Sequence, residues 1–374
     1  MNTTQKRTWA EIHLGSIEHN VRAMREKLPA LCRFLGVVKA DAYGHGAVPV
    51  ARRLEAMGCE YLAVACLDEA LELREAGLRA PILILGYTDP ELAQSLVGHD
   101  ITQAVGSLDM ARSLSAHVDS GQVRVHLKLE TGMGRTGFRV LSERELSDAA
   151  EALKLPGLEV EGVFTHFAVS DVYGDPFTAE QYRRFLEGVE ALERAWGRRF
   201  AIRHCANSGA VINYPQYGLD MVRPGIATYG LYPAKETGGI ALCPAMELKT
   251  RVAQITEHQP GDTVSYGRTF TVTAPMRIAV LPIGYGDGLH RCLSGKLEVL
   301  LHGVRARQLG RICMDMCMVD ITHIPDVKPG DVATIFGRDG EGFLSVDELA
   351  EKAGTISYEL LCAVSGRVPR IYME

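Results

Sequence analysis

Short apolar runs alternate with charged, amphipathic segments over the first two thirds of the chain. The runs that predict strands are residues 34–40, 61–66, 82–86, 101–105, 123–129, 160–167, 202–206 and 221–223. Between most of them, apolar residues recur at steps of three and four, which is the period of a helix packed on one face. Strands that alternate with helices lie parallel, because each crossover returns the chain to the same edge. About eight such units predict a (β/α)8 TIM-type barrel, and a doubly wound open sheet is the alternative.

The pattern changes near residue 241. Segments such as MRIAVLPIGYGDG and LEVLLHGVRARQLG are typical of strands separated by glycine and proline turns, and helical periodicity is nearly absent until SVDELAEKAG. These features indicate a second, mainly antiparallel β domain. We therefore expect an α/β chain with a barrel at 14–240 and a C-terminal β domain at 241–374.

Composition narrows the classes of function. With 374 residues, 47% of them hydrophobic and 23% charged, the chain has the make-up of a soluble globular protein. A net charge of −6 gives no footprint for nucleic acid, and no apolar run is long enough to span a membrane. The nine cysteines are scattered, so we expect free thiols and no metal site. Because the first residues lack an apolar signal core, we expect a cytoplasmic location.

Polar side chains follow the strands at the end where barrels form their sites. Lys39 ends the first run, and His166 ends the sixth. The full set expected at this end is Lys39, Tyr43, Arg135, His166, Asn207, Ser208, Arg223, Gly225 and Ile226. Barrels often bind phosphate after strands 7 and 8, so ANSGA and RPGIA predict an anion site. Tight turns without a ligand are the alternative for these motifs.

The fifth expected strand, VRVHLKLE, adds a second clue. Its valines and leucines share one face, which we expect against the helices, and Lys128 then points into the barrel. A buried ammonium is costly, so Lys128 needs a partner or a chemical change. Glu130, on the same face, is the simplest partner.

Several motifs together resemble those of the alanine racemase family, over essentially the whole chain. In order they are VVKADAYGHG, TGMGRTGF, THFA, HCANSGA, VRPGIATYG, VSYGRT, IGYGDG, GRICMDM and TISYE. The resemblance implies interconversion of L-alanine and D-alanine with pyridoxal 5'-phosphate, supplying D-alanine for peptidoglycan. It also implies that residues 1–13 add a strand to the β domain, and that two copies form a head-to-tail homodimer with shared active sites.

The same resemblance assigns roles to individual residues. Lys39 would carry the cofactor and serve as one base, and Tyr266 of the partner subunit would serve as the other. Arg223, with His166 beside it, would face the pyridine nitrogen, and Lys128 matches a position that is often carbamylated. The implied cofactor contacts are Lys39, Tyr43, Asn207, Ser208, Arg223, Gly225, Ile226 and Tyr358. The implied substrate contacts are Arg135, Tyr285, Met314, Asp315 and Tyr358.

Other interpretations remain open at this point. Another barrel enzyme with the same cofactor, such as a decarboxylase or a D-amino-acid lyase, could reuse Lys39, although SYGRT and CMDM argue against it. A non-catalytic cofactor carrier would need no β domain. Without the resemblance, Lys39 could be a solvated strand end, and Tyr266 would be taken for a packing residue in a strand.

Overall fold

The computed structural model describes residues 7–234 and 239–374, which form two compact units. Ser16–Ala42 and Gly46–Cys243 make up the first, which we call the barrel unit. The second, the β unit, contains the described residues before Ser16, the segment Tyr43–His45 and Pro244–Glu374. No helix within the described residues is long and apolar enough to cross a bilayer.

Eight parallel strands form the closed centre of the barrel unit. They are β2 (Arg33–Val37), β3 (Tyr61–Val64), β4 (Ile82–Ile84), β5 (Ile101–Val105), β6 (Val123–Glu130), β8 (Leu158–Phe164), β9 (Ile202–His204) and β10 (Met221–Val222). They pair in the order β5, β4, β3, β2, β10, β9, β8, β6, and a β5–β6 pairing closes the ring. The predicted barrel is confirmed, and closure excludes the open sheet.

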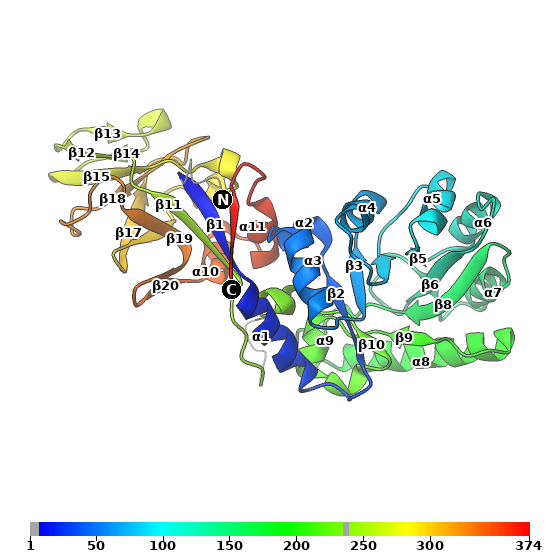
Figure 1. Ribbon diagram of the computed structural model, residues 1–374. Helices are drawn as coiled ribbons and strands as arrows, with labels where there is room; N and C mark the ends of the chain where they lie inside the picture. Colours follow the sequence, from blue (N-terminus) through cyan, green and yellow to red (C-terminus); the bar gives the residue numbers. More distant parts are fainter. Residues whose placement is uncertain (1–6, 235–238) are drawn as a thin grey trace. The chain divides into compact units, whose positions relative to one another are not determined.

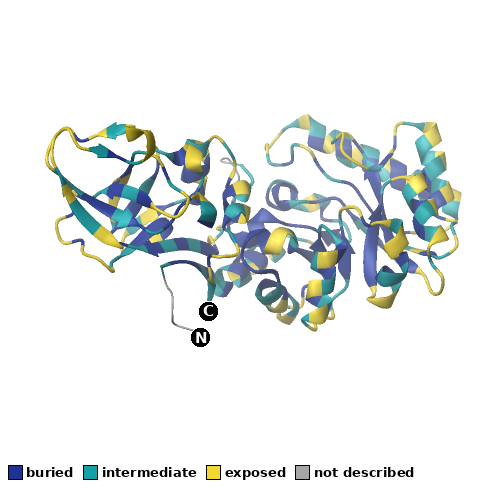
Figure 2. Cartoon of the chain, turned by 90° about the horizontal axis from the view of Figure 1, so that it is seen from above, coloured by how far each residue is buried: buried dark blue, intermediate teal, exposed yellow. Residues whose placement is uncertain are grey.

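Helices lie around these strands (Figure 1). They are α1 (Leu14–Arg25), α2 (Lys39–Tyr43), α3 (Ala47–Ala56), α4 (Leu67–Glu75), α5 (Ala93–Gly98), α6 (Leu108–Ala116), α7 (Glu143–Ala152), α8 (Pro176–Trp196) and α9 (Ser208–Asn213). Shorter pieces are η1 (Pro90–Leu92), β7 (Phe138–Arg139), η2 (Pro215–Tyr217) and η3 (Ile226–Tyr229). Figure 2 shows the strands largely buried and the helices exposed on their outer faces, as their amphipathic sequences require.

The β unit is built on a mixed but mainly antiparallel sheet. Its strands are β1 (Thr8–His13), β11 (Met246–Arg251), β12 (Gln254–His258), β13 (Thr263–Val264), β14 (Phe270–Thr271), β15 (Met276–Leu281), β16 (Glu298–Leu301), β17 (Val304–Leu309), β18 (Cys317–Asp320), β19 (Val332–Asp339), β20 (Gly342–Leu344) and β21 (Arg370–Met373). The main sheet has the order β12, β15, β18, β17, β16, β19, β11, β1, β21, and β13 pairs only with β14. This mainly antiparallel domain was predicted from the change in pattern near residue 241.

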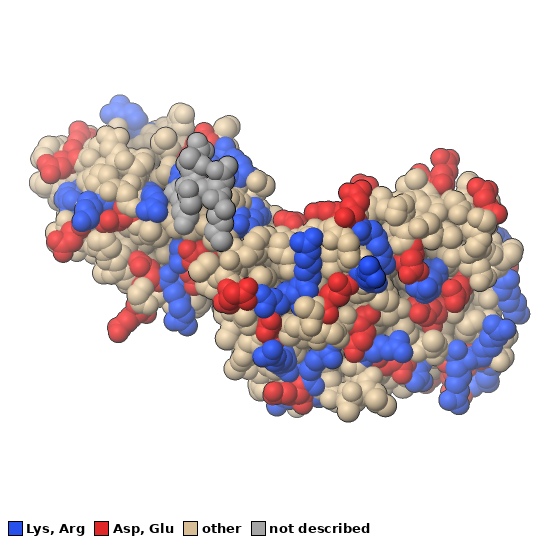
Figure 3. Space-filling model, in the orientation of Figure 1, with Lys and Arg blue, Asp and Glu red and all other residues tan. Residues whose placement is uncertain are grey.

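The first described strand lies inside this sheet. β1 pairs antiparallel with β11 and parallel with β21, so segments from the two ends of the chain are neighbours. Thr8 and Thr250 join side chains across the first pairing at 3.0 Å. The remaining elements of the unit are η4 (Tyr266–Arg268), η5 (Tyr285–Asp287), η6 (Arg291–Leu293), α10 (Val346–Ala353) and α11 (Ser357–Ala363). On the face in Figure 3, basic and acidic side chains are interspersed, in keeping with the modest net charge.

Candidate active site

Lys39 begins a left-handed turn. Strand β2 ends at Val37, so the prediction that Lys39 ends the strand was two residues too long. Residues 40–43, none of them glycine, all have φ between 52° and 54°. In this region the Cβ atom meets the next carbonyl oxygen, which costs about 1–2 kcal/mol per residue. Such strain persists only where surrounding interactions enforce it, and it is typical of functional sites.

Two carboxylates enforce the turn. Glu69 on α4 accepts hydrogen bonds from the N–H of Ala40 at 2.6 Å and of Ala65 at 2.7 Å. Asp41 accepts one through Oδ1 from the N–H of Ala47, at the start of α3, at 2.7 Å. The backbone after Lys39 is therefore tied to two helices at the C-terminal end of the barrel.

Arg223 is buried directly after β10 and donates hydrogen bonds to several neutral acceptors. They are Nδ1 of His204 at 2.8 Å, the carbonyl of Thr165 at 2.7 Å, Nδ1 of His166 at 3.4 Å and the carbonyl of Cys205 at 3.4 Å. No carboxylate within the described residues forms an ion pair with it. Burial lowers the pKa of Arg223 to about 10, so it stays charged at neutral pH. This uncompensated charge makes the end of the barrel attractive to an anion.

His166 lies near several cations of the site, and they affect its pKa. It lies two residues beyond β8, which ends at Phe164, and so does not end the strand as predicted. Its pKa is held well below the usual value, first by burial and then by a set of nearby cations. In order of effect these cations are Arg223, Arg135, Lys128 and Lys39. The structure thus brings five of the predicted site residues together, and it keeps the imidazole neutral.

Lys128 points into the barrel, as the alternation in β6 predicted, and is buried. Its Nζ donates to Oγ1 of Thr136 at 2.5 Å, and burial together with nearby Arg135 lowers its pKa to about 8. The Glu130 carboxylate is taken up instead by the backbone N–H groups of Gly132 at 2.5 Å and Arg135 at 3.1 Å. Glu130 is therefore not its hydrogen-bond partner, because the turn that follows β6 competes for the carboxylate.

The segments after β9 and β10 present converging donors. The hydroxyl oxygen of Ser208 accepts hydrogen bonds from the N–H of Gly225 at 2.9 Å and of Ala227 at 3.2 Å. Asn207 caps α9 through its side chain, and Ile226 is fully buried at the start of η3. Backbone N–H groups that converge on one oxygen are the kind of donor set that holds phosphate.

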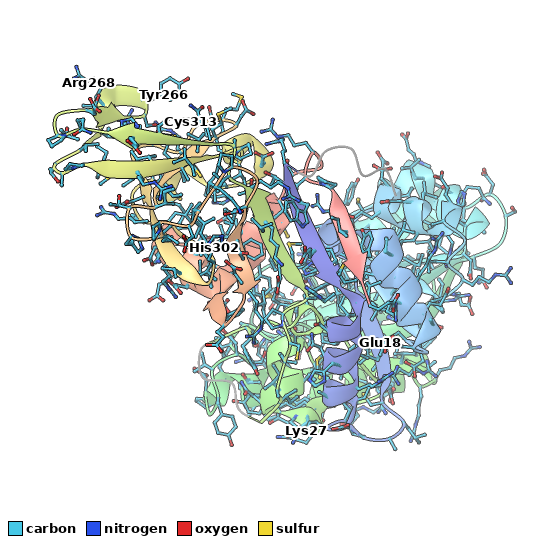
Figure 4. All side chains as sticks on the ribbon, turned by 60° about the vertical axis from the view of Figure 1, so that its left-hand side comes forward. Glu18, Lys27, Tyr266, Arg268, His302 and Cys313 are labelled. Carbon is cyan, nitrogen blue, oxygen red and sulfur yellow. The ribbon has the colours of Figure 1, made fainter. Side chains whose placement is uncertain are left out.

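Tyr266 lies in the short helix η4 rather than in a strand, and its side chain is 71% exposed. The residues around it have unusual dihedrals, with φ of 68° at Ser265 and 73° at Gly267. The Ser265 hydroxyl donates to the carbonyl of Arg311 at 2.6 Å, which anchors the turn. Figure 4 shows Tyr266 with Arg268 and Cys313 at one end of the β unit.

Two further predicted residues of the β unit lie in adjoining segments: Tyr285 begins η5, and Met314 lies in the loop before β18. The N–H of Tyr285 donates to the carbonyl of Cys313 at 3.0 Å, and that of Gly286 to Met314 at 2.9 Å. Any side chain at Gly284 would place its Cβ 2.2 Å from the Cys313 carbonyl, so glycine is required for this approach. The half-exposed side chains of Tyr285 and Met314 are thereby held in one place.

Asp315 is fixed through a bridging arginine. Arg367 donates to Asp315 at 2.6 Å and to the buried Asp287 at 2.7 Å, and Asp287 also pairs with Arg7. In the same unit, the rings of Tyr43 and Tyr358 lie 6.1 Å apart. Burial raises the pKa of Tyr43, so its hydroxyl remains a donor.

Sequence reasoning missed two buried histidines, His204, which is hydrogen-bonded to Arg223, and His126, which lies next to His204. His204 joins Arg223 to His126, whose Nδ1 lies 2.8 Å from Nε2 of His204. His126 lies two residues before Lys128 in the same alternating strand, but no role was inferred for it, and Glu161 was not considered. The available signals were a histidine in the seventh expected strand, at the start of HCANSGA, and the pair Glu161–Gly162 inside a strand.

Comparison with known proteins gives a consistent result over the whole chain. Residues 12–233 match the alanine racemase N-terminal domain, and residues 245–372 match the C-terminal domain. An alanine racemase of Desulforamulus reducens is 46% identical over 369 residues, covering 98% of each chain.

Solved structures agree. An alanine racemase of Clostridium difficile 630 superposes with a TM-score of 0.94 at 40% identity, covering 100% of this chain and 97% of that one. An alanine racemase of Bacillus anthracis with bound L-Ala-P gives 0.93 at 38% identity, covering 99% and 96%.

Proposed function

Because the chain belongs to the alanine racemase family and is thus an amino-acid racemase, we propose that it interconverts L- and D-alanine with pyridoxal 5'-phosphate. The observation that carries this proposal is the convergence of Lys39, Lys128, Arg135 and Arg223 on His166. A group of cations around the buried Arg223 suits an anionic cofactor and a carboxylate substrate.

The donors of the site fit this cofactor. Ser208, Gly225 and Ile226 would hold its phosphate, with Tyr43, Asn207 and Tyr358 as further contacts. Arg223 can only donate a hydrogen bond, so it suits a ring nitrogen that accepts one. Lys39 would provide the attachment point. When bound, such a cofactor makes the α-proton of an amino acid acidic by withdrawing electrons from Cα.

Two bases on opposite faces of Cα then complete the reaction. For the D-isomer, the Lys39 amine would take the proton and the Tyr266 phenol would give one to the opposite face. For the L-isomer, the Tyr266 phenolate would take the proton and the Lys39 ammonium would give one. Arg135 and the Met314 backbone would fix the substrate carboxylate, and Asp315 would be a further substrate contact. Tyr285 and Tyr358 would narrow the entrance. The neutral state of His166 suits a neighbour that must not compete with Lys39 for the proton.

Tyr266 is exposed within its own chain, which supports a dimeric arrangement. We propose a homodimer in which Tyr266 and Met314 of each copy act in the site built on the other copy's Lys39. The enzyme would work in the cytoplasm and supply D-alanine for peptidoglycan.

Reaction in deuterated water tests the chemistry. Protein loaded with the cofactor should convert either alanine isomer into both, placing one deuterium at Cα and leaving the carboxylate intact. Loss of carbon dioxide or of ammonia, without formation of the opposite isomer, would identify the decarboxylase or lyase alternative instead.

Mixing two inactive variants tests the shared site. Lys39→Ala and Tyr266→Phe chains, unfolded and refolded together in equal amounts, should regain about a quarter of the wild-type activity, because half the dimers carry one intact site. Each variant refolded alone is the control. Absence of recovery, with heterodimers demonstrated by affinity tags, would show that both bases come from one chain.

A further inference from the structure

A row of polar side chains runs through the interior of the barrel from Arg223 to β3. Arg223 Nη1 lies 2.8 Å from Nδ1 of His204, and Nε2 of His204 lies 2.8 Å from Nδ1 of His126. His126 Nε2 lies 3.0 Å from Oε2 of Glu161, and the same oxygen accepts from the Tyr61 hydroxyl at 2.6 Å. Four strands and the segment after β10 each supply one member of this row.

Local irregularity in β8 places Glu161 inside the barrel. Val125 of β6 pairs with Val160, but the next residue, His126, pairs with Gly162, so Glu161 is the extra residue of a β-bulge. A bulge of this kind redirects a side chain. At Gly162, a Cβ would lie 2.8 Å from atoms of the His126 ring, so the ring occupies the space that a side chain would need. The pair Glu161–Gly162 therefore creates both the acceptor and the room for the histidine.

The chemistry of Arg223 and Glu161, at the two ends of the row, determines which ring nitrogen of each histidine carries the hydrogen. Arginine has no acceptor, so Nδ1 of His204 must accept and its Nε2 must carry the hydrogen. That hydrogen is donated to Nδ1 of His126, so His126 also carries its hydrogen on Nε2 and donates it to Glu161. A carboxylate can accept this bond and the Tyr61 bond at once.

The environment favours these charge states. Burial is the main influence lowering the pKa values of His126 and His204, which keeps both rings neutral. Burial opposes ionisation of Glu161, but the hydrogen bonds from His126 and Tyr61 prevail and lower its pKa. The row thus has a positive end at Arg223 and a negative end at Glu161, joined by two neutral imidazoles.

We propose that Glu161 is a positioning residue for Arg223, which it holds through His126 and His204 locked as Nε2–H tautomers. If either ring turned to the Nδ1–H tautomer, two donors would face each other inside the row. Arg223 would then lose the acceptor that orients its Nη1. The importance of this orientation for turnover rests on the proposed function, in which Arg223 faces the cofactor; the tautomers themselves do not.

Nitrogen-15 NMR of the imidazole rings tests the proposal directly. The protonated and unprotonated nitrogens of a neutral ring differ widely in chemical shift, and His126→Gln and His204→Gln variants assign the two signals among the twelve histidines. Both rings should be Nε2–H in the protein with and without pyridoxal 5'-phosphate. In Glu161→Leu, which removes the acceptor, the His126 signal should move toward a mixture of tautomers.

Matched variants separate the relay from general damage to the fold. Glu159→Gln changes a carboxylate on the same strand that lies outside the row, and it should leave both rings unchanged. Tyr61→Phe keeps the acceptor and should preserve the tautomers while raising the pKa of Glu161. Glu161→Leu should lower kcat for racemisation about 10–100-fold, by analogy with the loss of the hydrogen-bond partner of a metal-bound histidine, with KM little changed.

The outcomes distinguish the two proposals. Wild-type rings found as Nδ1–H or doubly protonated would overturn the relay, as would unchanged signals in Glu161→Leu. Nε2–H rings that respond to Glu161 in a protein that does not racemise alanine would support the relay and refute the function. A fall in kcat without any change in the ring signals would also reject the positioning role.

Discussion

The two proposed bases occupy turns with left-handed backbone, but the turns are built differently. After Lys39, residues 40–43 are all non-glycine and are held by bonds from Asp41 and Glu69 to other elements of the barrel unit. The Tyr266 turn contains Gly267, is anchored by the Ser265 hydroxyl, and leaves the phenol 71% exposed. The backbone at Lys39 is thus restrained by its own unit, whereas the Tyr266 side chain is exposed and, in the proposed homodimer, would be surrounded by the partner subunit.

The difference shows what each unit contributes to the proposed site. The barrel unit gathers cations around Lys39 and restrains the backbone beneath it at a cost in strain. The β unit fixes the position of Tyr266 but leaves the electrostatic environment of its hydroxyl to whatever packs against it. Variants of the two turns can test this contrast.

The largest effect should come from Lys39→Ala. Because Lys39 is proposed both to attach the cofactor and to act as a base, racemisation should be lost in both directions. Activity is measured from each isomer with cofactor in excess. The control is Lys27→Ala, because Lys27 is an exposed lysine just after the end of α1 (Figure 4). Substantial activity in Lys39→Ala would remove the contrast between the turns.

Tyr266→Phe should lower racemisation by about 10²–10⁴-fold, the usual contribution of a general base. Cofactor binding should be unaffected, since the phenol is proposed to act only on Cα. Tyr87→Phe is a matched control, because Tyr87 is 69% exposed and belongs to the barrel unit. If cofactor affinity fell as sharply as the rate, Tyr266 would have a structural role in the barrel site.

Replacing strained residues by glycine should stabilise each turn modestly. Ala40→Gly and Arg268→Gly, both at φ of 52°, should each gain about 1 kcal/mol, because glycine adopts this conformation without a Cβ clash. Thermal unfolding measures the gain, and Ala40→Gly should also lower kcat by loosening the backbone beside Lys39. Ala191→Gly, inside α8, should instead lose about 0.5–1 kcal/mol. A loss of stability in Ala40→Gly would show that the turn is not strained.

A last test concerns Lys128, whose charged form is disfavoured by the fold. With a pKa lowered from 10.5 to about 8, the folded state binds fewer protons than the unfolded state between these values. The free energy of unfolding should therefore rise as pH increases through this window, and Lys128→Met should remove the rise. Urea unfolding across that range measures it. Carbamylation of Lys128, visible by carbon-13 NMR with labelled bicarbonate, would weaken the rise by converting the amine into an anion.

Sequence periodicity was sufficient for the barrel because buried strands and amphipathic helices leave a repeated signal. The position of Lys39 and His166 relative to the strands was less well predicted, since a strand ends where hydrogen bonding ends and the apolar run continues past that point. The left-handed turn after Lys39 has little local signal, because Ala and Tyr favour other conformations. Hydrogen bonds to the Asp41 and Glu69 carboxylates help to hold it, and the partners in these bonds lie in other segments.

The buried row was missed for a related reason. A bulge at Glu161 shifts every later residue of β8 to the opposite face, and single-strand alternation cannot reveal it. The pairing of Lys128 with Glu130 was inferred from a shared face, but the turn after β6 offers the carboxylate closer donors. In both cases an irregular stretch of backbone, rather than another side chain, determines where the carboxylate lies and what it binds.

The position of β1 in the sheet also sets an order of assembly during synthesis. β1 precedes every other described strand, yet its neighbour β21 is the last of them, and Met373 follows its partner His13 by 360 positions. At the usual rate of translation β1 must wait about 20–70 s for β21, while the barrel strands emerge and can pair. The ribosome therefore releases a chain whose barrel has had time to fold before the β unit can close.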